Sequence, residues 1–147
     1  MTTKVAEVVE ASSTFFVAQT YRLYDAPPLG SLVRVGDSAG DGLVYGVVSN
    51  VSTGPLDTGR RVLPRGESEE SEEDLYRENP QLKHVLATRL EAAIVGYAGK
   101  AGLRQGLPPL PPHVHSFVFS TDPAELIEFA KDFHFLRRVI GHRAIEV

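Results

Sequence analysis

The stretch "LVYGVVSNVST", Leu43 to Thr53, is a long apolar run rich in valine. Such a run favours a buried β-strand, because β-branched side chains pack well on a pleated surface. Gly46 lies inside it, and a glycine within a strand often marks a β-bulge or a sharp bend at the corner of a barrel. The stretch therefore predicts a long strand that bends, as the wall of a small barrel requires.

Five more segments around this run have strand character. Before it, "VAEVVEASSTFFVAQTY" is divided by a Ser-Ser pair into two runs, and "SLVRVGD" alternates as a half-buried strand does. After it, "RLEAAIVGYAG" predicts another buried strand. "HVHSFVFS" predicts the last strand, with His113, His115, Phe117 and Phe119 on one face.

Helical signals follow the strands in two places. "SEEDLYRE" predicts one or two helical turns, and "NPQLKHVLAT" has Asn79 as an N-cap before Pro80. In "TDPAELIEFAKDFHFLRRVI", Asp122 is a good N-cap, Pro123 occupies the first helical position and Glu125 completes a capping box. Apolar residues at helical spacing follow, so a C-terminal helix is expected.

These elements predict a mainly β protein, a small closed or nearly closed six-stranded β-barrel with a short helical excursion and a C-terminal α-helix. The barrel would cover residues 1–119, with a helical or loop insertion at about 64–88. Residues 120–147 would form the C-terminal helix and a tail, packed on the barrel or extending from it. A chain of 147 residues fits one domain, which buries roughly two-thirds of its unfolded surface.

Composition excludes several classes of protein. The chain has no cysteine, which rules out disulfides, iron–sulfur clusters and thiolate zinc sites. No run approaches the ~20 apolar residues that cross a bilayer, and "MTTKVAEVVE" lacks the apolar core of a signal peptide. We expect a cytoplasmic protein with no membrane partner.

Charge is distributed unevenly along the chain. The net charge of −4 argues against bulk nucleic-acid binding, which usually needs a basic face. "ESEESEED", Glu67 to Asp74, holds six of the 19 acidic residues and is most simply a solvated loop or helix start. The candidate contact residues are arginines that precede this run or lie near the C-terminus: Arg60, Arg61, Arg65, Arg137 and Arg138.

Catalytic motifs are not found. "GYAGKAG" resembles a phosphate-binding loop, but Ile94 stands where its first glycine is required and Ala101 where Ser or Thr is required. The sequence has no G-x-S-x-G elbow and no cysteine nucleophile. We therefore predict a protein that is not an enzyme, with no catalytic residues and no cofactor.

The stretch "GLPPLPPHVHSF" admits three interpretations: a polyproline ligand, a His-x-His metal site, or a loop that leads into a strand. His113 and His115 would share a strand face, but a metal site needs a third ligand that the sequence does not indicate. "PPLPP" favours an extended polyproline helix, which SH3 domains recognise in flexible tails. Because strands are expected on both sides, an ordered crossover without a metal is favoured.

Seven stretches, in the same order, resemble the HAS-barrel family, the barrel module shared by HerA-type DNA translocases and the catalytic subunits of rotary ATP synthases. They extend from about Val5 to Ile140 and are "VAEVVEASSTFFVAQTY", "APPLGSLVRV", "VYGVVSNVSTGPLDTGRR", "LYRENPQL", "RLEAAIVGY", "LPPLPPHVHSFV" and "FAKDFHFLRRVI". Each is weak alone, and their order makes the set fairly specific.

In HerA-like proteins this barrel precedes an ATPase domain, assembles in a ring and docks nucleases. The resemblance thus implies a six-stranded barrel that forms a homo-oligomer, with a ring as one form, or binds a protein partner such as an ATPase or nuclease. It does not imply ATPase activity, because the sequence contains no P-loop domain. Since the sequence ends at Val147, a stand-alone barrel and a fragment of a longer protein both stay open.

Three functional hypotheses result. The leading one is a non-catalytic barrel for oligomer assembly or partner docking, in which Arg60 and Arg61 meet a neighbour, although solvated arginines flanking a loop explain them equally well. The alternative is a nucleic-acid-binding accessory protein of DNA processing that uses the arginines, including Arg143, with Tyr76 and Tyr97 as stacking residues. The third is a metal-dependent enzyme using His113 and His115.

Overall fold

The computed structural model describes residues 3–36, 42–57, 59–131 and 139. The fold is mainly β, and every strand pair of its single sheet is antiparallel. Two α-helices and a short 3-10 helix complete the elements found in the described residues. The predicted fold class is confirmed. Nor is any helix within these ranges long and apolar enough to span a membrane.

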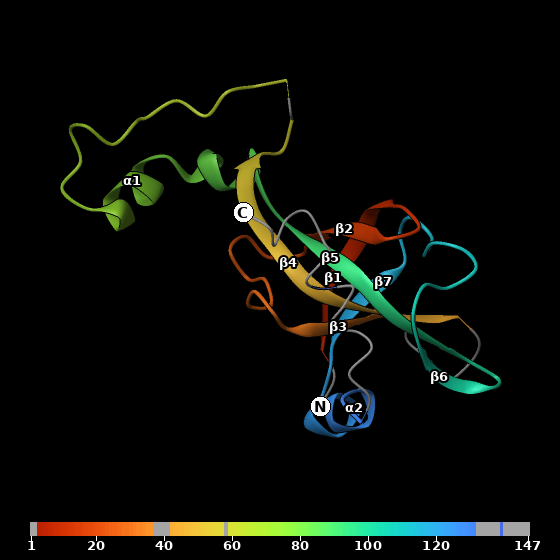
Figure 1. The fold of residues 1–147 in the computed structure, drawn as a ribbon. Coiled ribbons are helices and arrows are strands. Elements are labelled where there is room, and N and C mark those ends of the chain that lie inside the picture. Colours follow the sequence, from red (N-terminus) through yellow and green to blue (C-terminus); the bar gives the residue numbers. More distant parts are fainter. Residues whose placement is uncertain (1–2, 37–41, 58, 132–138, 140–147) are drawn as a thin grey trace.

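Six strands close the sheet into a ring (Figure 1). Its order is β2-β1-β7-β3-β4-β5, and a further pairing of β2 with β5 joins the two ends. These strands are β1 (Lys4–Ala11), β2 (Phe15–Thr20), β3 (Leu32–Val35), β4 (Leu43–Pro55), β5 (Leu86–Gly99) and β7 (Phe117–Ser120). A closed ring leaves few backbone groups unpaired along its strands, which limits unwanted edge pairing.

A seventh strand, β6 (Gly102–Gln105), was not predicted from the sequence. It pairs with the end of β5 in a hairpin and is not a member of the six-stranded ring. Gly102 has a φ of +94°, which glycine adopts readily and which lets the chain reverse there. The sequence "GKAGL" predicted this turn, but the four residues of β6, which begin inside that stretch at Gly102, are too few for a clear strand pattern.

The two long strands bend as the glycine in the opening stretch predicts. The register between β4 and β5 shifts between Tyr45 and Gly46, and again between Val48 and Asn50. A side chain at Gly46 would place its Cβ 2.9 Å from Cε1 of Phe16 and 3.0 Å from Cβ of Ala92. Gly46 therefore serves both the bend and the close packing inside the ring.

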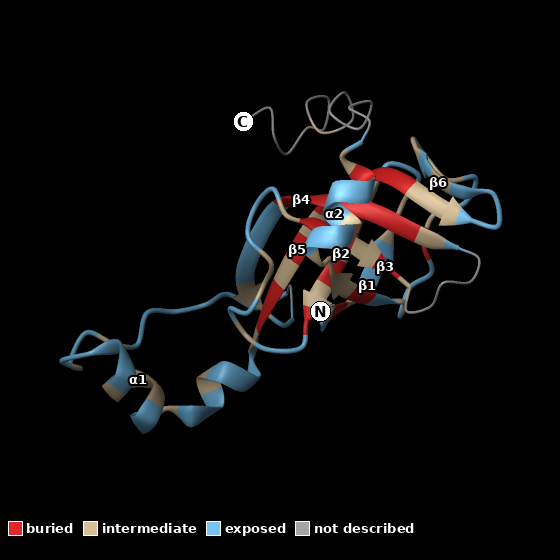
Figure 2. Cartoon of the chain, turned by 90° about the horizontal axis from the view of Figure 1, so that it is seen from below, coloured by how far each residue is buried: buried red, intermediate tan, exposed pale blue. Residues whose placement is uncertain are grey.

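The interior of the ring holds the larger of two hydrophobic clusters (Figure 2). Alternation along each strand sends one set of side chains inward, as the pleat requires. Phe16 is the largest side chain in this cluster and is fully buried. The other members of the cluster come from all six ring strands and include Val8, Ala18, Val33, Val48, Leu90, Ile94 and Val118.

The second cluster lies on the outer face of the sheet, beneath helix α2 (Pro123–Phe129). Phe129 is 2% exposed, and its ring centroid lies 5.4 Å from that of Tyr45. Gly96 makes room for this ring, because a Cβ there would approach Cε2 of Phe129 to 2.6 Å. Gln105 on β6 donates to the carbonyl of Phe129 at 2.7 Å, so β6 helps to hold the end of α2.

The expected start of the last strand at His113 is wrong, because β7 begins at Phe117. Ser116 donates its backbone N–H to the carbonyl of His113, and His115 has a φ of +74°. A left-handed residue inside a turn breaks the alternation, so the two histidines do not share a strand face. The proline stretch before them is an ordered crossover from β6 to β7, with Pro112 buried.

Candidate functional site

The segment between β4 and β5 projects from the ring (Figure 1). We call residues 56–85 the β4–β5 excursion. Its first and last residues are joined by a backbone hydrogen bond, in which Leu56 donates to the carbonyl of Val85 at 2.7 Å. Figure 2 shows that most of it is exposed, in contrast to the sheet.

Two short helices form the returning half of the excursion. Helix α1 (Glu72–Glu78) begins at Ser71, whose Oγ accepts from the N–H of Asp74 at 3.1 Å. Acidic residues in its first turn suit the positive end of the helix dipole. The 3-10 helix η1 (Pro80–His84) follows directly. Helical turns form in both predicted segments, but in "NPQLKHVLAT" the helix is of the 3-10 type and ends at His84, and the last three residues belong to β5. The Asn79 side chain makes no cap for η1 and donates instead to the carbonyl of Leu75.

Tyr76 fixes the excursion to the loop between β2 and β3. Its hydroxyl lies 2.9 Å from that of Tyr24, and the Nζ of Lys83 lies 5.0 Å from the centroid of its ring. The hydrogen bond with Tyr24, and then burial, raise the pKa of Tyr76. The hydrogen bond between Tyr24 and Tyr76 therefore attaches the excursion to the rest of the described chain at a point away from its two ends.

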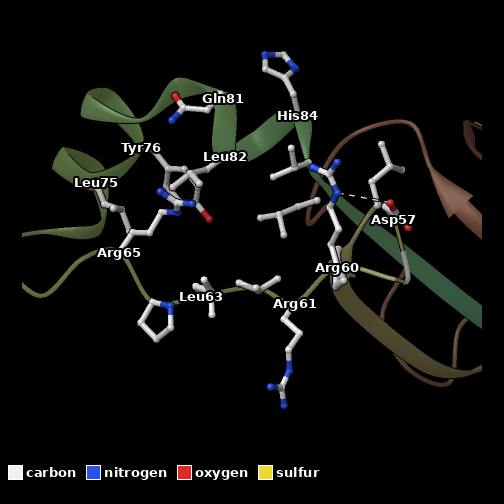
Figure 3. Close-up of a pocket in the computed structure, with 16 residues that line it drawn as sticks. Asp57, Arg60, Arg61, Leu63, Arg65, Leu75, Tyr76, Gln81, Leu82 and His84 are labelled. Carbon is white, nitrogen blue, oxygen red and sulfur yellow. Dashed lines mark ion pairs between the residues drawn. The ribbon is translucent and has the colours of Figure 1, made fainter.

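A groove of about 620 Å³ lies between the outgoing and returning halves of the excursion (Figure 3). Its walls are mainly apolar and include Leu56, Val62, Leu63, Leu75, Leu82 and Val85. Val62 is 60% exposed and Leu63 64%, so the outgoing half contributes side chains that the described chain does not cover.

Three predicted contact residues come together at this groove: Arg60, Arg61 and Arg65 all line it. Nε of Arg60 lies 3.6 Å from a carboxylate oxygen of Asp57, and both side chains are exposed. Figure 3 shows Arg61 directed away from the helices and Arg65 directed toward Tyr76. The other two candidates, Arg137 and Arg138, fall in the range 132–138, outside the described residues.

The residues proposed for nucleic-acid stacking are not brought together. Tyr76 lines the groove with the arginines. Tyr97 lies on β5 near its far end, whereas the groove adjoins the first residue of that strand, Leu86. A single base-stacking surface built from both tyrosines is therefore not formed.

His115 is paired with a carboxylate on β1. Nδ1 of His115 lies 2.7 Å from Glu7, whose other carboxylate oxygen accepts from the hydroxyl of Tyr21 at 3.0 Å. The hydrogen bond with His115, then that with Tyr21, lowers the pKa of Glu7. Within the described ranges, no group of three or more His, Asp or Glu side chains is placed to hold a metal ion.

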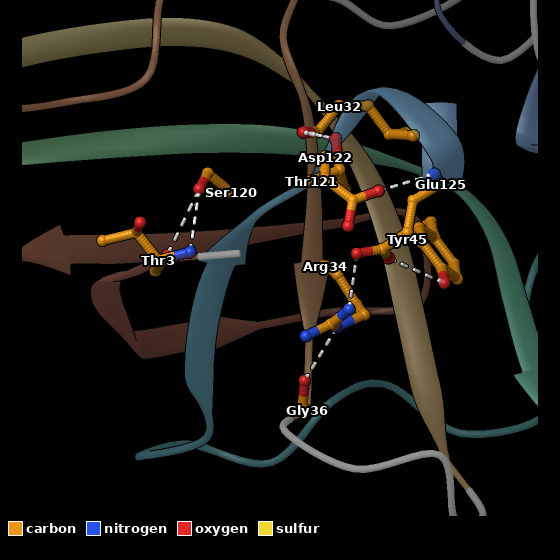
Figure 4. Close-up of polar contacts among 9 residues, drawn as sticks. All are labelled: Thr3, Leu32, Arg34, Gly36, Tyr45, Ser120, Thr121, Asp122 and Glu125. Carbon is orange, nitrogen blue, oxygen red and sulfur yellow. Dashed lines mark hydrogen bonds and ion pairs between the residues drawn. The ribbon is translucent and has the colours of Figure 1, made fainter. Parts of the chain in front are cut away.

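A polar cluster beneath α2 was missed by the sequence analysis (Figure 4). Nη1 of Arg34 pairs with Glu125 at 2.7 Å, and the two side chains are 13% and 19% exposed. The Tyr45 hydroxyl donates to the same carboxylate at 3.3 Å, and burial followed by Glu125 raises the pKa of Tyr45. Arg34 also donates to the carbonyl of Gly36 at 3.1 Å.

This cluster attaches α2 to the outside of the ring. Asp122 caps the helix as predicted, accepting from the N–H of Glu125 at 2.8 Å. The expected capping box is incomplete, because the Glu125 carboxylate is engaged by β3 and β4 instead of the helix start. The signal that could have revealed the pair is the alternation in "SLVRVGD", which directs Arg34 to the outer face. Since every member contacts a structural partner, we assign the cluster a positioning role.

In the comparisons with known proteins, no family model and no curated protein matches this sequence. The function is therefore inferred from the geometry of the excursion.

Proposed function

We propose that this chain is a non-catalytic β-barrel module for oligomer assembly or protein-partner docking, and that the β4–β5 excursion is its docking element. The observation that carries the proposal is the groove, where uncovered apolar side chains and three arginines lie together. Arginine among apolar side chains is a composition enriched at protein interfaces.

The energetics of the excursion support docking. Apolar surface in water costs about 25 cal/mol per Å², so exposed valine and leucine side chains gain stability when a partner covers them. Val62 and Leu63 lie in residues 61–65, whose backbone makes no hydrogen bond to another described residue. A projecting segment of this kind becomes ordered on a neighbour more readily than on its own chain.

The resemblance to the HAS-barrel family agrees with this role. In that family the barrel serves ring assembly and the docking of nucleases, so a partner ATPase or nuclease in the cytoplasm belongs to the proposal. The closed six-stranded ring is compatible with such a module, because it leaves loops and an outer face for neighbours.

Removing the excursion tests the role. Residues 57–84 are replaced by Asn-Gly, which joins the hydrogen-bonded pair Leu56 and Val85 through a two-residue hairpin turn. We expect this variant to retain the melting behaviour of the ring and to lose stoichiometric partners that co-purify with the full chain and are identified by mass spectrometry. Retention of every such partner by the shortened variant would overturn the proposal.

Nucleic-acid binding is the second candidate, favoured by the three arginines and Tyr76 in one groove. The acidic run that follows the arginines in the same excursion opposes it. If it is correct, affinity for single-stranded DNA falls steeply with salt, and replacing Arg60, Arg61 and Arg65 with Gln reduces the salt dependence. An absence of binding at low salt, measured by fluorescence anisotropy, eliminates this candidate.

A further inference from the structure

We propose that the docking partner of the excursion is a second copy of this chain, and that two excursions pair antiparallel across a two-fold axis. The inference rests on the proposed docking role and names its partner. It comes from the order of side chains along the excursion, which is self-complementary in charge when two copies run in opposite directions.

Three segments follow one another along the excursion, and the last of them runs into helix α1 of the returning half. An arginine segment, residues 59–61, stands next to the ring; an apolar centre, Val62 to Pro64, follows; and the acidic segment, Glu67–Asp74, forms the tip. The residues of the first two parts are exposed, and most of the acidic segment is as well. The excursion is therefore positive near the sheet and negative at its far end.

Antiparallel pairing aligns these parts. With an axis between Leu63 and Pro64, residue 60 of each copy stands opposite residue 67 of the other, which sets Arg60 against Glu67; beyond this point the extended register ends, because Glu69 donates to the carbonyl of Gly66 in a turn. The apolar centres meet at the axis, where they cover the exposed side chains of Val62 and Leu63. A two-fold interface requires one patch that complements itself, and this sequence order provides it.

The existing contacts leave the arginines available. The exposed ion pair of Arg60 with Asp57 at 3.6 Å is a weak competitor, because solvated pairs contribute little. Arg61 and Arg65 have no ion pair with any described residue. The acidic segment has one described ion pair, between Asp74 and Arg77, so its glutamates keep their charge free for another chain.

The two apolar centres cannot be joined by a continuous β-ladder. Pro64 has no backbone N–H, so a continuous strand ladder through the centre is excluded. Association therefore depends on side-chain burial at the centre and on ion pairs at its two ends. Such pairing is sensitive to salt, because ions screen exposed charges beyond ~10 Å at 0.1 M.

Two charge-reversal variants test the pairing. The first carries Arg60→Glu and Arg61→Glu, and the second carries Glu67→Lys, Glu69→Lys and Glu70→Lys. A matched control, Lys100→Glu with Arg104→Glu, makes the same change in charge as the first variant on exposed residues of the β5–β6 hairpin. Analytical ultracentrifugation of the purified full chain measures mass against concentration at low and high salt.

We expect a dimer for the unaltered chain at low salt and at least about a tenfold weaker dimer at high salt. Each reversal variant alone is monomeric, while the control dimerises like the unaltered chain. An equimolar mixture of the two variants recovers a dimer, because each reversed segment then faces one of opposite charge. All changed residues are exposed or half-buried, so unchanged thermal unfolding confirms that each variant folds.

Three results would overturn the inference: a strict monomer up to ~100 µM, well above typical dimer dissociation constants; reversal variants that still dimerise; or a mass beyond that of a dimer, which would favour head-to-tail assembly. The docking role has its own test in the shortened variant. If the full chain is monomeric yet the Asn-Gly variant loses a stoichiometric partner of another sequence, self-pairing fails and docking stands.

Discussion

Apolar side chains are buried in the ring, whereas several of those in the β4–β5 excursion are exposed to solvent. In the ring, Phe16 and Val48 are closed off from water by neighbours from several strands. In the excursion, Val62 and Leu63 remain largely in solvent and face a groove. The difference teaches that stability and recognition are separated along this chain: the closed sheet holds the fold, and the projecting segment offers a surface.

The largest expected effect comes from truncating the core of the ring. Phe16→Ala removes a fully buried phenyl group from the interior of the β-ring, and we expect it to lower the free energy of unfolding by about 3–5 kcal/mol. Urea denaturation monitored by circular dichroism measures the loss. Val62→Ala is the matched change in the excursion and is expected to alter stability by less than about 0.5 kcal/mol. Equal losses in both variants would break the contrast between the two regions.

Adding one methyl group tests the same contrast within a single strand. Gly46→Ala brings a Cβ against Phe16 and Ala92, so we expect a loss of about 1–3 kcal/mol. Gly54→Ala, near the excursion end of β4, meets nothing within 4 Å and is expected to be neutral or slightly stabilising. Thermal and urea unfolding of both variants provide the comparison, and a tolerated Gly46→Ala would contradict the packing described for the ring.

The ion pair beneath α2 is expected to have a smaller effect. Glu125→Gln leaves the mostly buried Arg34 without its charged partner, and we expect a loss of about 1–2 kcal/mol. Its control, Glu128→Gln, breaks a solvated pair with Lys131 and should cost less than about 0.5 kcal/mol. Hydrogen exchange of α2 amides shows whether the helix loosens in the first variant alone. Identical exchange in the two would show that Arg34 does not hold the helix.

The smallest expected effect is a pH dependence on the outer face of the ring. The folded state lowers the pKa of Glu7 below its ordinary value of 4.5, so it favours the carboxylate. This contribution is present above pH 4.5 and is lost as pH falls through the lower folded pKa. Glu7→Gln should therefore flatten the decline of stability in that acidic range. If the free energy of unfolding of the unaltered chain and of Glu7→Gln fell in parallel with pH, the lowered pKa of Glu7 would be contradicted.

The sequence predicted most of the ring because its signals are local. Alternation and β-branching mark β1 to β5 and the core of β7, and Gly46 marks the bend in β4. Asp122 identifies the start of α2, and Ser71 starts α1 close to where the sequence placed helical turns. Local patterns failed at His115, where a left-handed conformation inside a turn delays the start of the last strand to Phe117.

The candidate site was predicted only as a set of arginines. Their charge could be read from Arg60, Arg61 and Arg65, but not the groove that they line with Leu75 and Leu82 from the returning half. The returning half is in turn held to the loop between β2 and β3 by a contact between residues distant in sequence, Tyr24 with Tyr76. No pattern along one segment encodes a contact of that kind.

The sequence by itself therefore determined the class of the fold, the bend at Gly46, the helix starts and the uneven distribution of charge. Only the tertiary structure decided that β2 pairs with β5 to close the ring, that Glu125 binds Arg34 instead of completing its capping box, and that the excursion encloses a groove. The physical reason is that propensity and periodicity act over a few residues. Ring closure, buried ion pairs and grooves depend on which distant surfaces meet when apolar area is removed from water.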